Sequence, residues 1–163
     1  MAPAIITLTP DLSLRPITDE LAAFLGPAIA CIEPWSQIHY PASRLTAFFT
    51  AEDPALSRHA VFVSDEPAGV IAVRNPWLNG PYLQLLALLP PFQGQSFGAG
   101  LLAWFEGTAS PHNRWVWLCH SSFNTRAGAF YARHGFEAVT ELRDLLIDGT
   151  DEILMRKRIN CPA

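Results

Sequence analysis

The stretch from Leu86 to Leu102 constrains this 163-residue chain more than any other feature. An apolar run ends at the pair Pro90 and Pro91, and a loop of small and polar residues then leads into a second apolar run. This order predicts a strand, a loop and a helix. Because the first N–H groups of a helix lack backbone partners and carry the positive end of its dipole, the loop is suited to phosphate oxygens. The segment therefore favours a nucleotide-like ligand and an enzyme.

Size and composition limit the class of protein. Half of the residues are of hydrophobic type and only 16% are charged, which argues against a disordered chain. No repeat or low-complexity linker divides the chain, so we expect a single domain over residues 1–163. The net charge of −4 argues against broad electrostatic binding of nucleic acid. No uncharged apolar run reaches ~18 residues, so no membrane span is expected.

The cysteines point to a reducing compartment. Cys31, Cys119 and Cys161 are widely spaced and show neither CxxC nor Cys/His spacing. We therefore expect no disulfide scaffold and no metal site. The N-terminus also lacks a basic segment followed by a long apolar run, which a signal peptide would have. Together these observations predict a cytoplasmic protein.

Hydrophobic periodicity and chain breakers predict strands that alternate with helices, and hence α/β layers around a mixed sheet. Strands are expected at residues 5–15, 59–63, 70–74, 82–89, 115–119, 137–147 and 152–159. Helices are expected from residue 19 to 25 with an interruption at Gly26 and Pro27, from 43 to 50 with Ser43 as N-cap, from 98 to 107, and from 124 to 134. A loop is expected over residues 75–81, and Asp148–Gly149 indicates a hairpin turn.

Two segments and the order of the elements resemble the GNAT superfamily of N-acetyltransferases. The pattern PxxQGxxxG from Pro90 to Gly98 is similar to the family's acetyl-CoA loop. The pattern NxxAxxFYxxxGF from Asn124 to Phe136 is similar to the family's helix after the fifth strand. The resemblance implies an α/β fold with a mixed, mostly antiparallel sheet of six or seven strands, flanked by about four helices.

The resemblance assigns acetyl-CoA to the first segment, and the chemistry of these residues agrees. Converging donors without bulky side chains suit a diphosphate, and the backbone amides of the loop can supply them. The residues expected at the diphosphate are Gln93, Gly94, Gln95, Ser96, Phe97, Gly98 and Ala99. The family's splayed strand would place the pantetheine arm on the backbone of Leu86, Ala87 and Leu88. An ordinary strand–loop–helix with a Gly-rich cap is the alternative that the loop by itself leaves open.

Ser96 departs from the family pattern, which usually has the first glycine of a pair here. Serine still donates its N–H. If the position requires a positive φ, serine costs about 1 kcal/mol and weakens the binding of coenzyme A.

Two residues of the second segment resemble family site residues. Asn124 resembles an asparagine that contacts the cofactor, and it is equally suited to cap the helix. Tyr131 resembles a tyrosine beside the sulfur of coenzyme A, where a phenol can protonate the departing thiolate. A core aromatic paired with Phe130 is the alternative for Tyr131.

The base that deprotonates the acceptor amine is the least defined part. The strands at residues 82–85 and 117–120 offer no carboxylate. His120, with an ordinary pKa near ~6.5, and Glu33, in the segment that resembles the family's acceptor region, are the candidates. A structural role for each, and deprotonation through ordered water, stay open.

Other reactive or aromatic residues receive weaker assignments. Cys119 precedes His120, but neighbours on a strand point to opposite faces, so a nucleophilic pair is not expected. The aromatic side chains Trp35, Trp77, His39 and Tyr40 are candidates for a wall of the acceptor pocket.

The expected function is transfer of an acetyl group from acetyl-CoA to an unidentified small-molecule or peptide amine by direct attack, without a metal. A non-catalytic acyl-CoA-binding or regulatory module is the alternative. A nucleotide-binding domain is a weaker rival, since the chain lacks the GK[ST] ending of a P-loop and the Rossmann GxGxxG. Many relatives form homodimers, and the sequence leaves that open here.

Overall fold

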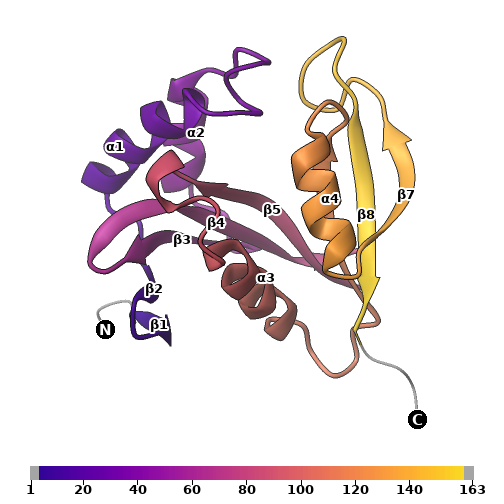
Figure 1. Cartoon of the computed structure of the whole chain (residues 1–163), viewed down its shortest axis with the longest axis horizontal. Coiled ribbons are helices and arrows are strands. Elements are labelled where there is room, and N and C mark those ends of the chain that lie inside the picture. Colours follow the sequence, from indigo (N-terminus) through magenta and orange to yellow (C-terminus); the bar gives the residue numbers. More distant parts are fainter. Residues whose placement is uncertain (1–3, 160–163) are drawn as a thin grey trace.

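The computed structural model describes residues 4–159, and these form one twisted sheet with helices on both faces (Figure 1). The described residues contain eight strands: β1 (Ile6–Thr9), β2 (Leu12–Arg15), β3 (Leu56–Val63), β4 (Glu66–Trp77), β5 (Gly80–Leu88), β6 (Trp115–Ser121), β7 (Glu137–Leu142) and β8 (Glu152–Arg158). The same residues contain four α-helices and one 3₁₀ turn: α1 (Asp19–Ala30), α2 (Ala42–Thr50), η1 (Pro90–Phe92), α3 (Phe97–Gly107) and α4 (Thr125–Arg133). The strand order is β1-β2-β3-β4-β5-β6-β8-β7, and only β5 and β6 pair in parallel.

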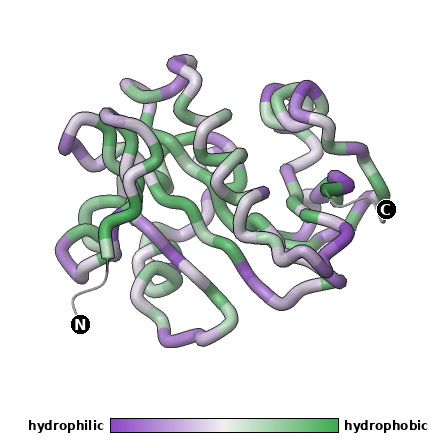
Figure 2. Tube along the Cα trace, turned by 90° about the horizontal axis from the view of Figure 1, so that it is seen from below, coloured by the Kyte–Doolittle hydropathy of each residue, from purple (hydrophilic) through white to green (hydrophobic). Residues whose placement is uncertain are grey.

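The sheet separates two hydrophobic cores. Along β4, Val70 and Ala72 pack with α1 and α2, whereas Ile71 and Val73 pack with α3 and α4. Successive side chains of a strand point to opposite faces, so a continuous apolar run serves both cores. Hydrophobic residues accordingly follow the central strands in Figure 2. The predicted α/β architecture is confirmed.

Helix α1 runs without a break through Pro27, so the predicted interruption at Gly26 and Pro27 is wrong. Thr18 caps the helix by accepting from the Leu21 N–H. Gly26 lies against α2, where an added Cβ would stand 2.1 Å from Thr46 Oγ1. The free energy gained by packing α1 closely on α2 exceeds the free energy lost with the one backbone hydrogen bond that Pro27 cannot make. Helix α2 is capped at Pro41, not at Ser43 as predicted.

The sheet has more strands than expected because residues 5–15 form a hairpin instead of one strand. Pro10 lies in the turn, and the Leu12 N–H donates to Thr9 Oγ1 at 3.1 Å. The predicted loop over residues 75–81 is also wrong. Strand β4 continues to Trp77, which pairs with Gly80 at the start of β5.

The predicted tight turn at Asp148–Gly149 is replaced by a longer connection between β7 and β8. Strand β7 ends at Leu142 and β8 begins at Glu152. Asp144 organises the connection, because its Oδ1 accepts from the Gly149 N–H at 2.6 Å and its own N–H donates to Asp151 at 3.2 Å. This loop therefore reaches further from the sheet than a two-residue turn would.

The parallel strands β5 and β6 separate soon after they meet. Their pairing is limited to Tyr82 with Trp117 and Leu83 with Leu118. Strand β5 stays paired to β4 as far as Leu88. The edge of residues 86–88 that faces β6 is therefore left without a strand partner. A splayed central strand was expected at these residues, and the structure confirms it.

Candidate active site

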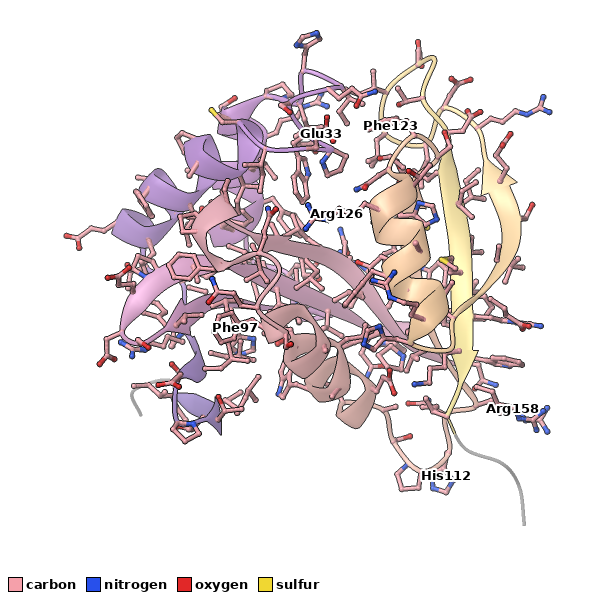
Figure 3. The ribbon with its side chains drawn as sticks, in the orientation of Figure 1. Glu33, Phe97, His112, Phe123, Arg126 and Arg158 are labelled. Carbon is pink, nitrogen blue, oxygen red and sulfur yellow. The ribbon has the colours of Figure 1, made fainter. Side chains whose placement is uncertain are left out.

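A cavity of about 1260 Å³ opens where β5 and β6 diverge. Its walls come from β5, the start of α3, the inner side of α4, the segment between α1 and α2, and the loop between β7 and β8. In Figure 3, Glu33 labels the segment after α1 and Arg126 labels α4, on the two sides of this opening. Leu86, Ala87 and Leu88 all line it. One cavity thus joins segments that are far apart in the sequence.

The loop before α3 presents free backbone donors to the cavity. Within residues 4–159, no backbone N–H from Gly94 to Ala99 donates to a protein acceptor. Amides of this kind at a helix N-terminus suit anionic oxygens. The side chain of Gln93 donates to the Leu88 carbonyl at 2.7 Å, and that of Gln95 donates to the Pro91 carbonyl at 2.6 Å. Gln93 therefore holds the loop to the end of β5, and Gln95 holds it to the turn η1.

Two residues of this loop have left-handed backbones. Gly94 has φ +73°, and a Cβ placed there would meet nothing within 4 Å. Ser96 has φ 67°, and its side chain makes no capping hydrogen bond to α3. Ser96 therefore has the positive φ at which a serine costs about 1 kcal/mol. The side chain of Phe97 packs against the core on the α3 side, so only its backbone faces the loop.

Asn124 begins α4 and lies at the cavity wall. Its Oδ1 accepts from the Ala127 N–H at 3.2 Å, which confirms it as the N-cap. Asn124 also lines the cavity, so the cap and a contact with a ligand are compatible.

Tyr131 lies on α4 with its ring among Phe130 and Phe136 and its hydroxyl at the cavity. Burial raises the pKa of this phenol well above its usual range, so it keeps its proton at neutral pH. The hydroxyl makes no hydrogen bond within the described residues, where no fully buried polar side-chain atom lacks a partner. Its oxygen is therefore not completely buried, and Tyr131 offers an unengaged proton donor.

The two predicted bases differ in their surroundings. Glu33 is exposed at the outer end of the cavity. His120 lines the cavity, and its Nδ1 lies 2.9 Å from the Ser121 carbonyl oxygen. Its ring packs on α4 at Gly128, where an added Cβ would stand 3.0 Å from Nε2. The structure therefore brings His120 to the site with its second nitrogen against the helix.

Sequence reasoning missed a third ionisable residue of the cavity, Glu152. It begins β8 opposite Ser121, is only 5% exposed, and lines the cavity. The Ser121 hydroxyl donates to Glu152 Oε1 at 2.6 Å. Burial raises the pKa of this carboxyl, and the bond from Ser121 partly opposes that shift. The signal in the sequence is an acidic residue at the first position of the last apolar strand, whereas the family pattern points to the strands β5 and β6.

Cys119 also faces this cavity and forms part of a neutral polar group. The Tyr82 phenol and the Cys119 thiol interact, and burial raises the pKa of both groups. Burial raises the pKa of Cys119 to about 11, so the thiol stays protonated and is a weak nucleophile. This agrees with the expectation that Cys119 and His120 form no nucleophilic pair. Cys31 is exposed, and Cys161 lies outside the described residues.

The outer part of the cavity is apolar and aromatic. Of the aromatic residues predicted there, Trp35, Tyr40 and Trp77 line it, whereas His39 is exposed and is not part of the lining. Leu145 and Leu146, on the loop between β7 and β8, are half-exposed at its edge.

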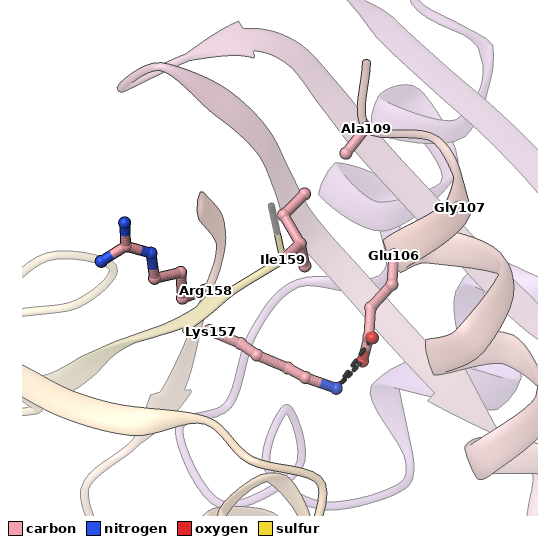
Figure 4. A pocket seen from close by; sticks show the side chains of 6 residues that line it. All are labelled: Glu106, Gly107, Ala109, Lys157, Arg158 and Ile159. Carbon is pink, nitrogen blue, oxygen red and sulfur yellow. Dashed lines mark hydrogen bonds and ion pairs between the residues drawn. The ribbon is translucent and has the colours of Figure 1, made fainter. Parts of the chain in front are cut away.

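A second hollow, of about 360 Å³, lies between the end of α3 and the end of β8 (Figure 4). Two of its charged residues pair with each other, because Lys157 Nζ contacts both carboxylate oxygens of Glu106, at 2.8 and 2.9 Å, and Arg158 also lines it. In residues 4–159 no group of three His, Cys, Asp or Glu side chains is placed to hold a metal ion. No helix within that range is long and apolar enough to cross a membrane.

Solved structures with the same architecture include enzymes that acetylate protein N-termini. An acetyltransferase of Salmonella typhimurium that modifies the N-terminal serine of ribosomal protein L7/L12 matches with a TM-score of 0.76 and 16% identity, over 96% of this chain and 100% of that chain. The ribosomal-protein-S18-alanine N-acetyltransferase of Escherichia coli matches with a TM-score of 0.70 and 18% identity, over 93% of this chain and 96% of that chain. A protein of Arabidopsis thaliana in complex with the bisubstrate analogue CoA-Ac-MVNAL matches with a TM-score of 0.68 and 22% identity, over 91% of this chain and 99% of that chain.

At identities this low, these structures establish the fold. No curated protein matches the chain. The model of the acetyltransferase (GNAT) family matches residues 17–136, which include the loop before α3 and all of α4. Because that match covers more than half of the sequence and the fold agrees with it, the chain belongs to the acetyltransferase (GNAT) family.

Proposed function

We propose that this protein transfers the acetyl group of acetyl-CoA to a primary amine, which attacks the thioester directly. The observation that carries the proposal is the convergence of three features on one cavity. These are the free amides of the loop before α3, the edge of β5 that lacks a strand partner, and the unengaged hydroxyl of Tyr131. Each suits a different part of the same ligand.

The residues present fit coenzyme A at the open end of the cavity. The amides from Gly94 to Ala99 would bind the diphosphate, with the dipole of α3 adding to the attraction. The edge of residues 86–88, which lacks a strand partner and whose Leu88 carbonyl accepts from Gln93, would bind the amide groups of the pantetheine arm, much as a neighbouring strand would. When bound, acetyl-CoA supplies an activated acyl group and a thiolate leaving group.

Tyr131 would donate a proton to the departing sulfur. Its phenol is protonated at neutral pH because burial raises its pKa, and no protein acceptor among the described residues occupies its hydroxyl. A positioned proton donor contributes roughly 10²–10⁴-fold to a reaction of this kind.

The walls of the cavity favour an acceptor with one amine and an apolar substituent. Its lining contains the carboxylates of Glu33 and Glu152 against three arginines, which does not suit a polycation. Leu145 and Leu146 offer an apolar edge. A peptide α-amino group beside an apolar side chain meets these conditions, and one of the similar structures is of an enzyme that modifies the N-terminal serine of a ribosomal protein.

The test is release of free thiol from acetyl-CoA in the presence of a panel of amines, with peptides that begin with apolar, polar and charged residues among them. Calorimetry with acetyl-CoA measures binding separately. We expect binding together with turnover on at least one amine. A lack of binding at millimolar acetyl-CoA would refute the assignment of the loop.

A non-catalytic acyl-CoA-binding module is the second candidate, favoured by the left-handed Ser96 in the loop. Binding of acetyl-CoA without turnover on any amine would support that alternative.

A further inference from the structure

We propose that Glu152 binds the ammonium group of the acceptor and takes its proton before the amine attacks. The inference rests on the proposed function, and it supplies the carboxylate that β5 and β6 lack.

The position of Glu152 fits this role. Ser121 ends β6 and Glu152 begins β8, and the two residues pair across the strands at the cavity wall. Ser121 occupies Oε1 of the carboxylate. In the described residues Oε2 accepts no hydrogen bond, and no fully buried polar side-chain atom there lacks a partner. Oε2 is therefore not completely buried, and because Glu152 lines the cavity, that oxygen is placed to meet a ligand within it.

The carboxylate of Glu152 has no positively charged partner among the described residues, because no Lys, Arg or His of residues 4–159 forms an ion pair with it. The titratable groups that interact with it are Tyr82 from β5 and Cys119 from β6, and both are neutral at pH 7 because their pKa values are raised. Tyr131 from α4 is neutral for the same reason. A buried carboxylate without a counter-charge is unfavourable, and an ammonium group would supply the missing charge.

Burial also prepares Glu152 to accept a proton. It raises the pKa of this carboxyl above the usual value for glutamate, which makes the carboxylate a stronger base than an exposed one. Glu33 is exposed and at the outer end of the cavity, and His120 has its Nε2 against α4. Of the three candidates, Glu152 alone combines burial, an unpaired charge and an unengaged oxygen at the cavity.

Glu152 and Tyr131 together account for every proton that moves in the reaction. Glu152 takes one proton from the ammonium group, and the free amine then forms the new N–C bond while the C–S bond breaks. Tyr131 gives its proton to the sulfur and recovers one from the nitrogen that becomes the amide. The proton on Glu152 leaves to water. The net products are the acetylated amine, the free thiol and one proton, so no further reactant is required.

The test is Glu152→Gln, which keeps the size of the side chain and an acceptor for Ser121. We expect kcat to fall by about 10²–10³-fold at pH 7, with the affinity for acetyl-CoA unchanged. Calorimetry with coenzyme A present should show weaker binding of the acceptor amine. The loss of kcat should become smaller as pH rises, because more of the acceptor is then a free amine. It should also be smaller for acceptors whose amine has a low pKa, for the same reason. Glu137→Gln, which removes an exposed carboxylate on β7, is the matched control and should leave activity unchanged.

A variant with the kcat, amine affinity and pH profile of the wild type would overturn the proposal and leave Glu152 a structural role. If Glu152→Gln does not fold, the kinetics of Glu152→Asp and the pH profile of the wild type test the proposal instead. The profile of kcat/KM should rise with pH through a pKa above the ordinary glutamate value, and a profile without that step would count against Glu152. Failure of the wild type to release thiol with any amine would instead refute the proposed function, and with it this inference.

Discussion

The two ends of the cavity are built by different means. At the end suited to phosphate, one continuous segment, residues 93–99, presents backbone amides. At the other end, Tyr82, Ser121, Tyr131 and Glu152 come from four elements and act through side chains. A site made of local backbone can be recognised from a motif, whereas a site made of converging side chains depends on how the sheet is assembled.

The largest effect on activity is expected from Tyr131→Phe, at the end of the cavity that acts through side chains. Loss of the proton donor should lower kcat by roughly 10²–10⁴-fold with little change in the affinity for acetyl-CoA. Tyr82→Phe provides the comparison, because it removes a second buried phenol of the same cavity, and it should lower kcat by less than about tenfold. Steady-state kinetics and calorimetry measure both. Equal kcat values for Tyr131→Phe and the wild type would remove Tyr131 from the mechanism.

At the end suited to phosphate, Gly94→Ala should change the affinity for acetyl-CoA rather than kcat. A methyl group would project into open space at a left-handed residue, where a ligand must approach closely. We expect the Kd of acetyl-CoA to rise by up to about tenfold, equivalent to about 1.4 kcal/mol. Gly149→Ala is the matched control, with φ +86° and equally open surroundings far from the loop. Both variants should lose a similar ~1 kcal/mol of stability, and an equal Kd for both would contradict the loop assignment.

A smaller effect, of opposite sign, is expected for Ser96→Gly. Glycine removes the strain of a left-handed serine, which costs about 1 kcal/mol, although glycine also increases the entropy of the unfolded chain. We expect acetyl-CoA to bind about two- to fivefold more tightly, with little change in melting temperature. Asn79→Gly, at another residue of positive φ outside the cavity, should leave binding unchanged. Weaker binding by Ser96→Gly would mean that the serine side chain itself contacts the ligand.

The smallest effect is a pH dependence of stability from Glu152. Its folded pKa is raised above the ordinary 4.5, so the folded protein holds a proton that the unfolded chain has already lost. The stability from this group is complete below pH 4.5 and is lost as pH rises through the raised pKa. Relative to the wild type, Glu152→Gln should therefore become more stable as pH rises from ~5 to ~8 in urea titrations. A difference that does not vary with pH would show that this carboxyl has an ordinary pKa.

Predictions from the sequence succeeded where one segment decides the outcome by itself. The helix after Asn124 and the loop before α3 follow from caps, glycines and apolar spacing, and both are found. Predictions failed where distant packing decides. Helix α1 continues through Pro27 because Gly26 packs on Thr46, and β4 continues to Trp77 because Gly80 returns beside it.

The sequence by itself determined the order of most strands and helices, the position of the loop before α3, and membership of the family. These properties depend on residues that are close together along the chain, so local propensity and spacing reveal them. The tertiary structure alone decided that Glu152 of the last strand stands beside Ser121 and near Tyr82 and Cys119. Strand order and register bring these side chains together, and neither can be read from periodicity within one strand.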